Sequence, residues 1–591
     1  MPLDDSATDK AVDEIVVHES DEVLAAEDAA SKQAGRASNK SSAKKSRGGF
    51  FKRRWLWAGL LLILVAVFAY PLSRDKLIGL VYKETFTVTV TDSKTNTLVS
   101  SATVSLDGVT AKTDASGKVK LMVPPGQGKL RVAKKYYKDF TKAQAIGLRS
   151  TGPVSVQLLA TGRQVPITVD NLITGKPVAN AEISVLKTTA KTDQHGQATI
   201  VLPATAASDQ ATVSASGYNK AQTSIQITSS VVSANTVKLT PTGHVYFLSN
   251  LSGSVDVVKV NLDGSGRQTV LKGTGQENPN TTSLLASRDW QYTALKAQRS
   301  GANPGLYLIN TSTDKVTQFD SGNADFTLIG WYGHFFMYDV VRNTIPAWQS
   351  GHETLKSYNA DTGQLNQLDQ GQAEGSSAAY AYQGFYNFYT LNDLLVYNTQ
   401  WYTYDASGGG YDLTGKSDSI RAVQPDGQNK KDYQGIPASG LGYIQAALFQ
   451  PQEIYYAAYN YGTNVTTYYK FADETVSTLS NLSQATFNQA YPTYLVSPSG
   501  NQTLWTNVRD GQNTLFTGDQ NAGGQKQIAS LSNYSPYGWF TDNYLLVSQN
   551  GSQLSIMPAG GLAAGQQPLK ITDYYKPTQT YNGYGYGYGG L

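Results

Sequence analysis

Apolar and polar residues alternate along most of the chain, in short runs that end at turn residues. Runs such as FTVTVTD at 86–92 and KVKLMV at 118–123 repeat with a period of two, and Asp, Asn, Gly and Pro lie between such runs. This alternation is typical of half-buried β-strands, because successive side chains of a strand point to opposite faces of its sheet. The closely spaced turns predict a mainly β protein.

An unbroken apolar run at residues 55–72 departs from this alternation. Its 18 residues carry no charge, and as a helix they are about 27 Å long, enough to cross the apolar core of a bilayer. Six basic residues precede the run between 44 and 54, and three follow it by residue 83. Because cytoplasmic flanks carry the excess of Lys and Arg, we expect an uncleaved signal anchor with a cytoplasmic N-terminus and extracytoplasmic C-terminal domains.

The apolar run therefore predicts a single-pass protein of the cell membrane, with the lipid bilayer as its partner through 55–72. Residues 1–54 are rich in Ala, Ser, Lys, Asp and Glu, and we interpret them as a disordered cytoplasmic tail with a basic juxtamembrane cluster. The alternatives are a buried core helix and a signal peptide cleaved near Val67-Phe68-Ala69. The long polar lead argues against a signal peptide, whose basic region is short.

Two segments after the apolar run repeat each other. TAKTDASGK at 110–118 recurs as TAKTDQHGQ at 189–197, 79 positions later, and the flanking apolar positions agree at the same offset. Agreement at one offset over several positions indicates internal duplication. Because both copies alternate as strands, the sequence predicts two tandem β-sandwiches, at 84–161 and 162–242.

The repeated Thr-Asp-x-x-Gly phrase contains residue types that bind metals or act in catalysis. Asp114 and Asp193 are equally suited to accept backbone N–H groups in a turn, and the glycines that follow tolerate positive φ. The second copy has His195 where the first has Ser116. We interpret the phrase as a hairpin turn in each copy and predict no metal site there.

The order G-x-P-V-x-x-A-x-V, T-D-x-x-G and V-x-A-x-G-Y resembles the carboxypeptidase regulatory-like, transthyretin-like family of β-sandwiches. The second copy is closer to that order, with Gly175-Lys176-Pro177-Val178 and Ser216-Gly217-Tyr218. The first copy has Asn96-Thr97-Leu98-Val99 instead and lacks the Gly-Tyr pair. Members of this family are non-catalytic spacers or binding modules. The resemblance implies that residues 84–242 form such modules.

A different repeat begins at Gly243. Units of apolar strands separated by polar turns recur about every 43 to 60 residues, the interval of four-stranded propeller blades. The sequence predicts a β-propeller of six or seven blades at 243–580, followed by a Gly/Tyr-rich tail at 581–591, which supplies a closing strand in one interpretation. The turn Ser497-Pro498-Ser499-Gly500 resembles blade turns of TolB-type and WD-like propellers. A large β-sandwich or a β-helix is the alternative.

The composition of the chain and its lack of known motifs exclude several kinds of metal-binding and catalytic site. The 591 residues include no Cys, which excludes disulfides, Cys-ligated zinc and thiol nucleophiles. The net charge is only +3, so no basic field indicates nucleic-acid binding, and we predict none. The sequence contains no G-x-S-x-G, H-E-x-x-H, phosphate-loop or Rossmann motif. We therefore assign no catalytic residue, no metal and no cofactor.

Carboxylates keep an enzymatic alternative open, because glycosidases act with paired Asp or Glu alone. His334 and His352 also lie in the predicted propeller, where carboxylates are available as partners. Spacing along the sequence singles out no pair. The candidate carboxylates are Asp339, Glu353, Asp393, Asp405 and Glu453.

The propeller segment contains two stretches that interleave Tyr and Trp with Asn, Gln and Thr, at 379–405 and 454–469. Aromatic faces stack on sugar rings or apolar peptide groups, and amides supply hydrogen bonds. The alternative is that alternate tyrosines pack between blades. The predicted ligand-binding residues are Tyr386, Tyr389, Trp401, Tyr402, Tyr456, Tyr459 and Tyr461.

The sequence favours a membrane-anchored extracytoplasmic binding protein in which a sandwich stalk presents a propeller head to a protein or a cell-surface glycan. One alternative is a carbohydrate-active hydrolase or lyase built on the propeller. The other is a surface sensor whose acidic cytoplasmic segment, 4–28, docks a partner.

Overall fold

β-strands form the regular structure of the described residues, which contain no helix. All of these residues belong to one compact unit, Tyr82–Leu591. The computed structural model describes residues 82–147, 152–203, 205, 207–227, 235–391, 393–437, 442–480, 482–483, 494–509, 512–530, 534–549 and 553–572. The prediction of a mainly β chain is confirmed for this part.

Three predicted segments lie outside the described residues. They are the cytoplasmic tail at 1–54, the membrane span at 55–72 and the Gly/Tyr-rich tail at 581–591. Within the part of the chain that the structure describes, no helix has the length and apolar character needed to cross a bilayer.

The first duplicated segment forms two sheets, ordered β4-β1-β7 and β3-β2-β5-β6. Its strands are β1 (Glu84–Asp92), β2 (Thr103–Leu106), β3 (Val109–Lys112), β4 (Lys118–Val123), β5 (Gly126–Ala133), β6 (Phe140–Ile146) and β7 (Val154–Leu158). Alternate residues of β1, namely Phe86, Val88 and Val90, are fully buried. They share one apolar core with residues of the other sheet, including Val104 and Leu130, so the period-two pattern marks the inner face.

The second segment repeats this topology, with sheets ordered β11-β8-β14 and β10-β9-β12-β13. Its strands are β8 (Arg163–Asn171), β9 (Glu182–Val185), β10 (Thr188–Lys191), β11 (Gln197–Leu202), β12 (Ser208–Ser214), β13 (Ala221–Gln226) and β14 (Asn235–Leu239). In both segments the first strand pairs with the last in parallel and with the fourth in antiparallel fashion.

The repeated Thr-Asp-x-x-Gly phrase forms the same turn in both copies. Asp193 Oδ1 accepts the backbone N–H groups of His195 and Gln197 at 2.8 and 2.9 Å, and Asp114 makes the equivalent pair of bonds. Gly196 has a φ of 70°, and a Cβ there would lie 2.5 Å from the Val169 carbonyl oxygen. The turn interpretation is confirmed. Among the described residues, no three His, Asp or Glu side chains group as metal ligands.

Seven consecutive sheets follow from residue 244, each built from strands adjacent in sequence. They are β15–β17, β18–β21, β22–β25, β26–β30, β31–β34, β35–β38 and β39–β42. The strands of the first three sheets are β15 (His244–Ser249), β16 (Asp256–Asn261), β17 (Gln268–Leu271), β18 (Ser283–Ala286), β19 (Tyr292–Ser300), β20 (Asn303–Asn310), β21 (Lys315–Ser321), β22 (Ala324–Tyr332), β23 (Phe335–Arg342), β24 (Glu353–Asn359) and β25 (Leu365–Gln370).

The remaining four sheets complete the series. Their strands are β26 (Ala373–Gly375), β27 (Ala379–Leu391), β28 (Leu394–Asp405), β29 (Ser417–Val423), β30 (Lys431–Pro437), β31 (Gly442–Gln450), β32 (Glu453–Asn460), β33 (Val465–Ala472), β34 (Thr475–Leu479), β35 (Leu495–Val496), β36 (Gln502–Arg509), β37 (Gln512–Asp519), β38 (Lys526–Ser530), β39 (Tyr534–Thr541), β40 (Tyr544–Gln549), β41 (Gln553–Pro558) and β42 (Leu569–Lys570). Each sheet is an antiparallel meander, as in a propeller blade.

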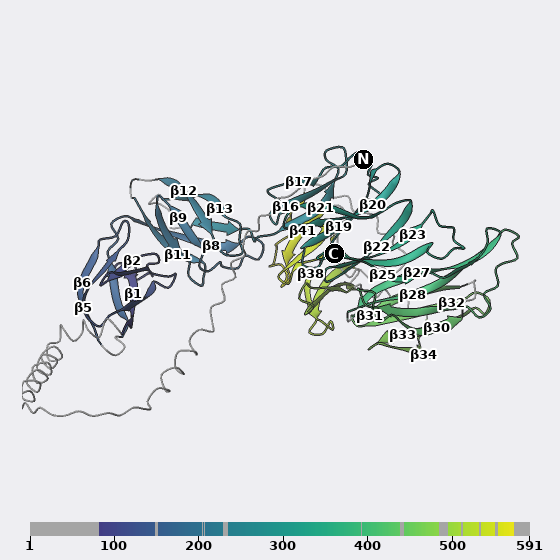
Figure 1. Cartoon of the computed structure of the whole chain (residues 1–591). Helices are drawn as coiled ribbons and strands as arrows, with labels where there is room; N and C mark the ends of the chain where they lie inside the picture. Colours follow the sequence, from purple (N-terminus) through teal and green to yellow (C-terminus); the bar gives the residue numbers. More distant parts are fainter. Residues whose placement is uncertain are drawn as a thin grey trace, which may run out of the picture. The chain divides into compact units, whose positions relative to one another are not determined.

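The first and last sheets pack together and close the series into a ring. Val257 and Val260 of β16 share one apolar core with Leu554 and Ile556 of β41, and Figure 1 shows these two strands side by side. The described residues from 244 onward thus form a seven-bladed β-propeller, within the predicted range of six or seven. The first blade contributes three strands, and residues 573–591, which include the predicted closing strand, lie outside the described part.

Two buried tryptophans join neighbouring blades in the same way. The Trp331 indole on β22 donates to the Leu285 carbonyl on β18 at 2.9 Å. The Trp539 indole on β39 donates to the Leu495 carbonyl on β35 at 2.8 Å. Each bond runs from the first strand of one blade to the first strand of the blade before it. The recurrence supports the blade repeat.

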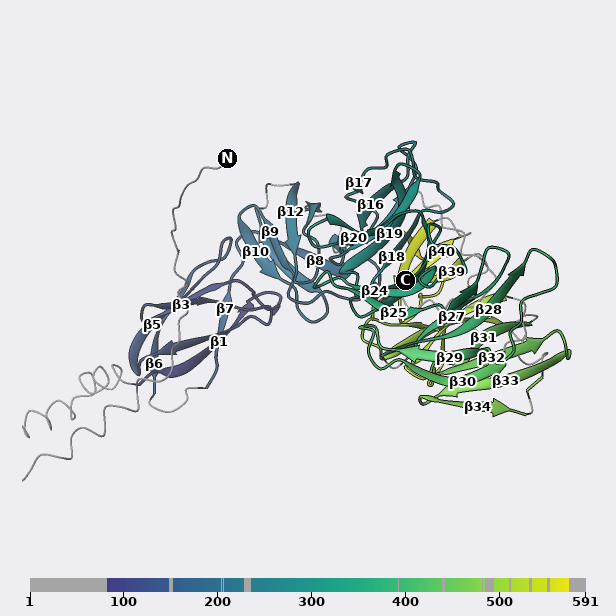
Figure 2. The ribbon, with the colours of Figure 1, turned by 45° about the vertical axis from the view of Figure 1, so that its right-hand side comes forward.

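The fourth blade has an unusually long central hairpin, with 13 residues in β27 and 12 in β28. Its two faces pack against different blades (Figure 2). On β29, Ile420 and Ala422 share a core with the fifth blade, β31–β34, whereas Val423 packs against the third blade, β22–β25. Period-two alternation along this blade therefore divides its side chains between two inter-blade spaces.

Candidate functional site

A cavity of about 200 Å³ lies between the fourth and fifth blades. Strands β28 to β33 supply its walls, together with the turn between β32 and β33. The lining residues are Gln400, Trp401, Asp418, Ile436, Tyr443, Ile444, Ala458, Tyr459, Asn460, Thr463, Val465, Thr467 and Tyr469. We refer to this space as the inter-blade cavity. Its lining combines aromatic rings with amide, hydroxyl and carboxyl groups, the mixture expected of a ligand site.

Trp401 is the largest side chain of the cavity wall and is held in place by its surroundings. Its indole N–H donates to the Ser417 carbonyl at 3.1 Å, and its ring packs against Ala381 and Leu413. The Lys416 ammonium lies 5.1 Å from the ring centroid. Because these contacts fix the ring, the wall is formed before any ligand arrives.

Two lining residues, Tyr443 and Tyr459, form an aromatic cluster with Tyr461, which is not itself part of the lining; we refer to these three tyrosines as the rim. The Tyr443 ring centroid lies 5.4 Å from that of Tyr459 and 5.9 Å from that of Tyr461, and the Tyr459 and Tyr461 rings meet edge to face at 5.0 Å. The Tyr459 hydroxyl donates to Asn464 Oδ1 at 2.9 Å. Tyr461 remains 55% exposed. The rim therefore presents rigid aromatic surface to solvent.

Asp418 is the carboxyl group of the cavity lining. It is 8% exposed, and its Oδ1 accepts the Trp401 backbone N–H at 2.7 Å. Burial raises the pKa of Asp418 to about 7, although the Trp401 hydrogen bond opposes that shift. No cationic side chain of the described residues pairs with it. The cavity thus holds a carboxyl group that changes charge near neutral pH.

The structure divides the seven predicted ligand-binding residues into three groups. Trp401 and Tyr459 line the cavity, and Tyr461 lies on its rim. Tyr389 and Tyr456 belong to the apolar core between the fourth and fifth blades, at 5% and 0% exposure, so they pack the blades and do not face a ligand. The prediction that these two tyrosines contact a ligand is therefore corrected by their burial in the core.

Tyr386 and Tyr402, the last two predicted residues, lie on the opposite face of the β27–β28 hairpin. Tyr402 pairs directly with Tyr382 across the strands, and their rings stack at 5.6 Å. The Tyr386 ring lies 5.7 Å from that of Tyr402. Glu353 of the third blade is close enough to raise the pKa of Tyr382, after the larger effect of burial. This tyrosine cluster faces the third blade rather than the cavity.

Glu353 and Asp339 form a buried carboxyl pair beneath that cluster. They are diagonal neighbours on β24 and β23, since Glu353 pairs with Val341, and each is 6% exposed. Burial raises the pKa of Glu353 to about 7, and burial together with Glu353 raises that of Asp339 well above its ordinary value. Glu353 Oε1 accepts the Phe385 N–H at 2.9 Å, whereas Asp339 Oδ1 has no hydrogen-bond partner among the described residues. The pair is enclosed between the third and fourth blades.

The other candidate carboxylates have separate structural roles. Asp405 is in a turn, where its Oδ1 accepts the Ser407 N–H at 2.8 Å. Glu453 pairs with Lys470 at 3.2 Å. Asp393 is at the hairpin tip with a φ of 66°. Of the five candidates, the fold brings together Asp339 and Glu353 alone.

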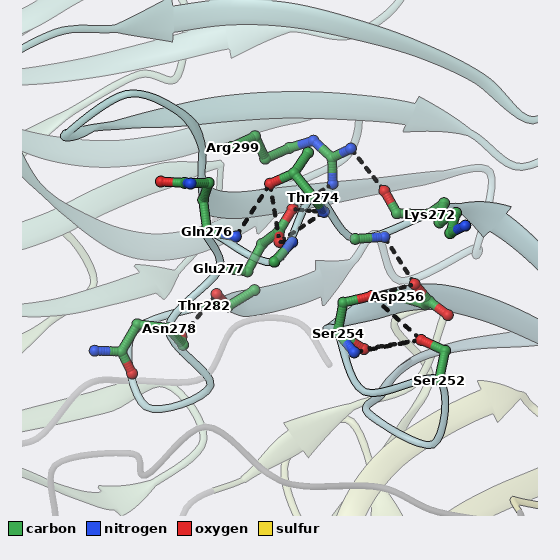
Figure 3. Close-up of polar contacts among 12 residues, drawn as sticks. Ser252, Ser254, Asp256, Lys272, Thr274, Gln276, Glu277, Asn278, Thr282 and Arg299 are labelled. Carbon is green, nitrogen blue, oxygen red and sulfur yellow. Dashed lines mark hydrogen bonds and ion pairs between the residues drawn. The ribbon is translucent and has the colours of Figure 1, made fainter.

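Glu277 is a buried carboxylate that has both backbone N–H donors and a cationic partner, in contrast to Asp418 (Figure 3). It accepts the backbone N–H groups of Thr274 and Gly275 at 2.9 to 3.0 Å and pairs with Arg299 at 2.8 Å. In the same region Asp256 accepts the Gly273 N–H at 2.7 Å. These contacts fix the segment between β17 and β18, so the cluster joins the first two blades.

His334 bridges two carboxylates at the joint between the second and third blades. Its Nδ1 lies 2.8 Å from Asp361 and its Nε2 lies 2.9 Å from Asp289. Burial opposes the charged ring, but the hydrogen bonds to Asp289 and Asp361 outweigh it and raise the pKa of His334. Both ring nitrogens therefore act as donors in the protonated form, which links the blades.

Sequence reasoning missed Asp418 and Tyr443. Asp418 shares a strand face with Ile420 and Ala422, so alternation in SDSIRAV places an acidic residue on the buried face. That signal was available, because a charged residue in an apolar register marks a candidate site. Tyr443 gave no comparable signal, since its partners in the rim come from β32 and the turn that follows it.

No protein-family model matches the chain, and no curated protein matches it. The β-propeller domain of the Trilobed protease from Pyrococcus furiosus is 12% identical, with 57% of this chain and 98% of that one covered, at a TM-score of 0.31. Oligogalacturonate lyase in complex with manganese is 13% identical over 52% of this chain and 82% of its own, at 0.28. Prolyl oligopeptidase B from Galerina marginata is 11% identical over 56% of this chain and 49% of its own, at 0.34. All three TM-scores are below 0.5, so these likenesses support no statement about function.

Proposed function

We propose that the protein is a membrane-anchored, extracytoplasmic binding protein whose propeller recognises a cell-surface glycan through the inter-blade cavity. The observation that carries this proposal is the lining of that cavity. Trp401 and Tyr459 supply ring faces, and Asn460, Thr467 and Asp418 supply polar groups within one space. Sugars require this combination, because each ring has apolar C–H faces and a polar edge of hydroxyls.

The size of the cavity fits a single sugar ring. Its volume is about 200 Å³, and an apolar cavity of about 150 Å³ in another protein accommodates a benzene molecule. A longer glycan then extends over the rim formed by Tyr443, Tyr459 and Tyr461. We therefore expect one terminal or branching unit to enter the cavity and the next unit to stack on the rim.

The rest of the proposal depends on sequence patterns. The apolar run at 55–72 would anchor the chain, and residues 84–161 and 162–242 would act as a stalk of two transthyretin-like units. Such a stalk would hold the propeller away from the bilayer surface, where polymeric surface glycans are accessible.

Binding of defined sugars by the full-length protein in detergent tests the proposal. Titration should quench the fluorescence of the tryptophans and give a saturating curve for at least one sugar. Replacing Tyr459 with Ala should weaken binding about tenfold, the loss expected from one aromatic contact of roughly 1.4 kcal/mol. The matched control is Tyr404→Ala, since Tyr404 is 49% exposed and stacks on Tyr380 at the other face of the hairpin.

Two results would overturn the proposal. One is the absence of saturable binding to any sugar, and the other is an equal loss of affinity in both variants. An enzyme of the hydrolase or lyase class is the rival, and the Asp339–Glu353 pair is its best candidate. Both residues are only 6% exposed and neither lines the cavity, which favours binding over cleavage. Release of new sugar ends from a bound glycan would reverse that preference.

A further inference from the structure

We propose that the inter-blade cavity selects sugar units with a protonated primary amine over neutral or acidic units. This inference rests on the proposed glycan binding and specifies its ligand. Its basis is a carboxyl group without a cationic partner in a cavity whose walls are aromatic. Asp418 supplies the carboxyl group, and Trp401, Tyr443 and Tyr459 supply the rings.

The position of Asp418 on its strand makes its carboxyl group available to a ligand. Its Oδ1 accepts the Trp401 N–H at 2.7 Å, and no donor of the described residues reaches its Oδ2. Ile420 and Ala422 occupy the same face of β29 and belong to the apolar core. A buried carboxylate in such surroundings is costly without a cation or further donors, and a ligand ammonium group supplies both.

The nearest cationic side chains of the same blade are already paired. Lys416 contacts Glu374 at 2.6 Å and lies over the Trp401 ring. Arg421 pairs with Asp369 at 2.9 Å on the opposite face of β29. Neither pairs with Asp418, so no cationic side chain of the described residues forms an ion pair with Asp418 when it ionises.

The aromatic lining adds to the preference for a cation. Ring faces attract an ammonium group through their negative quadrupole, and the effect strengthens where water is excluded. A neutral sugar keeps the stacking but forms no ion pair with Asp418. An acidic sugar places a second carboxylate beside Asp418, and like charges repel at that distance. The expected order of affinity is therefore amine, then neutral, then acid.

Binding of the amine must depend on pH in a defined direction. The titratable residues that line the cavity are Asp418, Tyr443, Tyr459 and Tyr469. Burial raises the pKa of Asp418 to about 7 in the empty cavity. Below that pH an ammonium ligand must displace the proton of Asp418, so its affinity should fall about tenfold for each pH unit.

Calorimetric titration of the full-length protein in detergent tests the inference, with D-glucosamine, N-acetyl-D-glucosamine, D-glucose and D-glucuronate as probes. At pH 7 glucosamine should bind at least about tenfold more tightly than N-acetylglucosamine, as a desolvated charge pair of 1.5 kcal/mol or more requires. Between pH 7 and pH 5 this preference should disappear, while binding of glucose stays constant. The pH comparison uses the unaltered protein and depends on no variant.

Substitution then assigns the preference to one side chain. Asp418→Asn retains the acceptor for the Trp401 N–H and should remove the preference for the amine together with its pH dependence. The matched control is Asp412→Asn, which changes the net charge by the same amount at an exposed position. Asp412 precedes Ser417, whose carbonyl accepts the Trp401 indole N–H, by five residues. The control should keep both properties.

The outcomes separate this inference from the proposed function. Equal binding of glucosamine and glucose overturns the amine preference and leaves glycan binding in place. A preference that survives Asp418→Asn also overturns it, because another group would then bind the amine. No binding of any of the four probes, combined with saturable binding of a longer glycan, rejects the cavity as the site of a single amine-bearing unit. No binding of any sugar rejects both.

Discussion

Two buried aspartates on either side of β29 differ in nearly every respect that concerns charge. Asp369 is 3% exposed and accepts bonds from Arg421 at 2.9 Å, Lys430 at 2.6 Å and the Tyr397 hydroxyl at 2.7 Å. Asp418 is 8% exposed and accepts one backbone N–H. Burial favours the neutral form of both, yet Lys430 and Arg421 hold the pKa of Asp369 below its usual range, whereas that of Asp418 rises to about 7.

The difference teaches how one strand serves two purposes. Arg421 and Asp418 are three residues apart on β29, so alternation points them to opposite faces. Toward the third blade the charges are complementary and the joint is closed. Toward the fifth blade a carboxyl group faces a cavity without a fixed cation. Complete pairing is typical of a structural joint, whereas incomplete pairing beside a cavity marks the candidate site for which binding is proposed.

The largest expected effect is that of pH on Asp418. Because its folded pKa of about 7 exceeds the unfolded value near 4, its contribution to stability is fully present below pH 4 and is lost as the pH rises through 7. Asp418→Asn removes this loss and should raise the free energy of unfolding at pH 9 by up to about 4 kcal/mol, from a shift of about three units. Urea denaturation at pH 4 and at pH 9 measures the difference.

At pH 4 the variant and the unaltered protein should be nearly equally stable, because Asp418 is then protonated in the folded state and only about half ionised in the unfolded state. Asp412→Asn, at an exposed turn, should show no such divergence at either pH. A constant difference between pH 4 and pH 9 would contradict the proposed environment of Asp418.

Breaking the buried ion pair between Arg421 and Asp369 should have the next largest effect on stability. Arg421→Met keeps much of the buried aliphatic volume but leaves Asp369 with Lys430 and Tyr397 alone, and should cost about 3 kcal/mol of unfolding free energy. Lys431→Met is the control, because Lys431 and Glu474 are both more than half exposed and such pairs contribute less than about 1 kcal/mol. Denaturation at pH 7 compares the two. Equal losses of unfolding free energy in the two variants would mean that the buried Arg421–Asp369 pair stabilises the protein no more than an exposed pair does.

The smallest expected effect separates core tyrosines from cavity tyrosines. The Tyr456 hydroxyl is fully buried and has no hydrogen-bond partner in the part of the chain that the structure describes. Tyr456→Phe removes this unsatisfied group and should raise the free energy of unfolding by about 1 kcal/mol. Sugar binding should stay unchanged in the same variant. A loss of stability would show that the hydroxyl has a partner after all.

Much of the fold was predictable because its signals are local. Period-two alternation marks which residues of β1 are buried, and the repeated Thr-Asp-x-x-Gly turn places the same hairpin in both copies. The interval between repeats gave the number of blades to within one. Closure of the ring was not derivable in this way, since it depends on contacts between β16 and β41 that alternation does not encode.

The candidate site was predictable only in part. Composition located the aromatic stretches, and Trp401, Tyr459 and Tyr461 are among the residues at the cavity. Composition does not indicate which tyrosine faces a core, so Tyr389 and Tyr456 were included although both are buried. Their exposure is set by how neighbouring blades pack, which one strand cannot specify.

The contacts that close the propeller ring also limit how early in synthesis the propeller can complete its fold. The Trp290 indole, in the turn between β18 and β19 of the second blade, donates to the Trp539 carbonyl of the last blade at 3.1 Å, across 249 positions. The chain has no cysteine to hold the ring covalently. The bond between Trp290 and Trp539 cannot form until nearly the whole propeller has been synthesised. Until then the apolar residues of the first blade lack the residues of β41 against which they pack. Contacts between residues so far apart in sequence also form slowly. We therefore expect the chain to be most susceptible to proteases and to aggregation while it is being synthesised and folded.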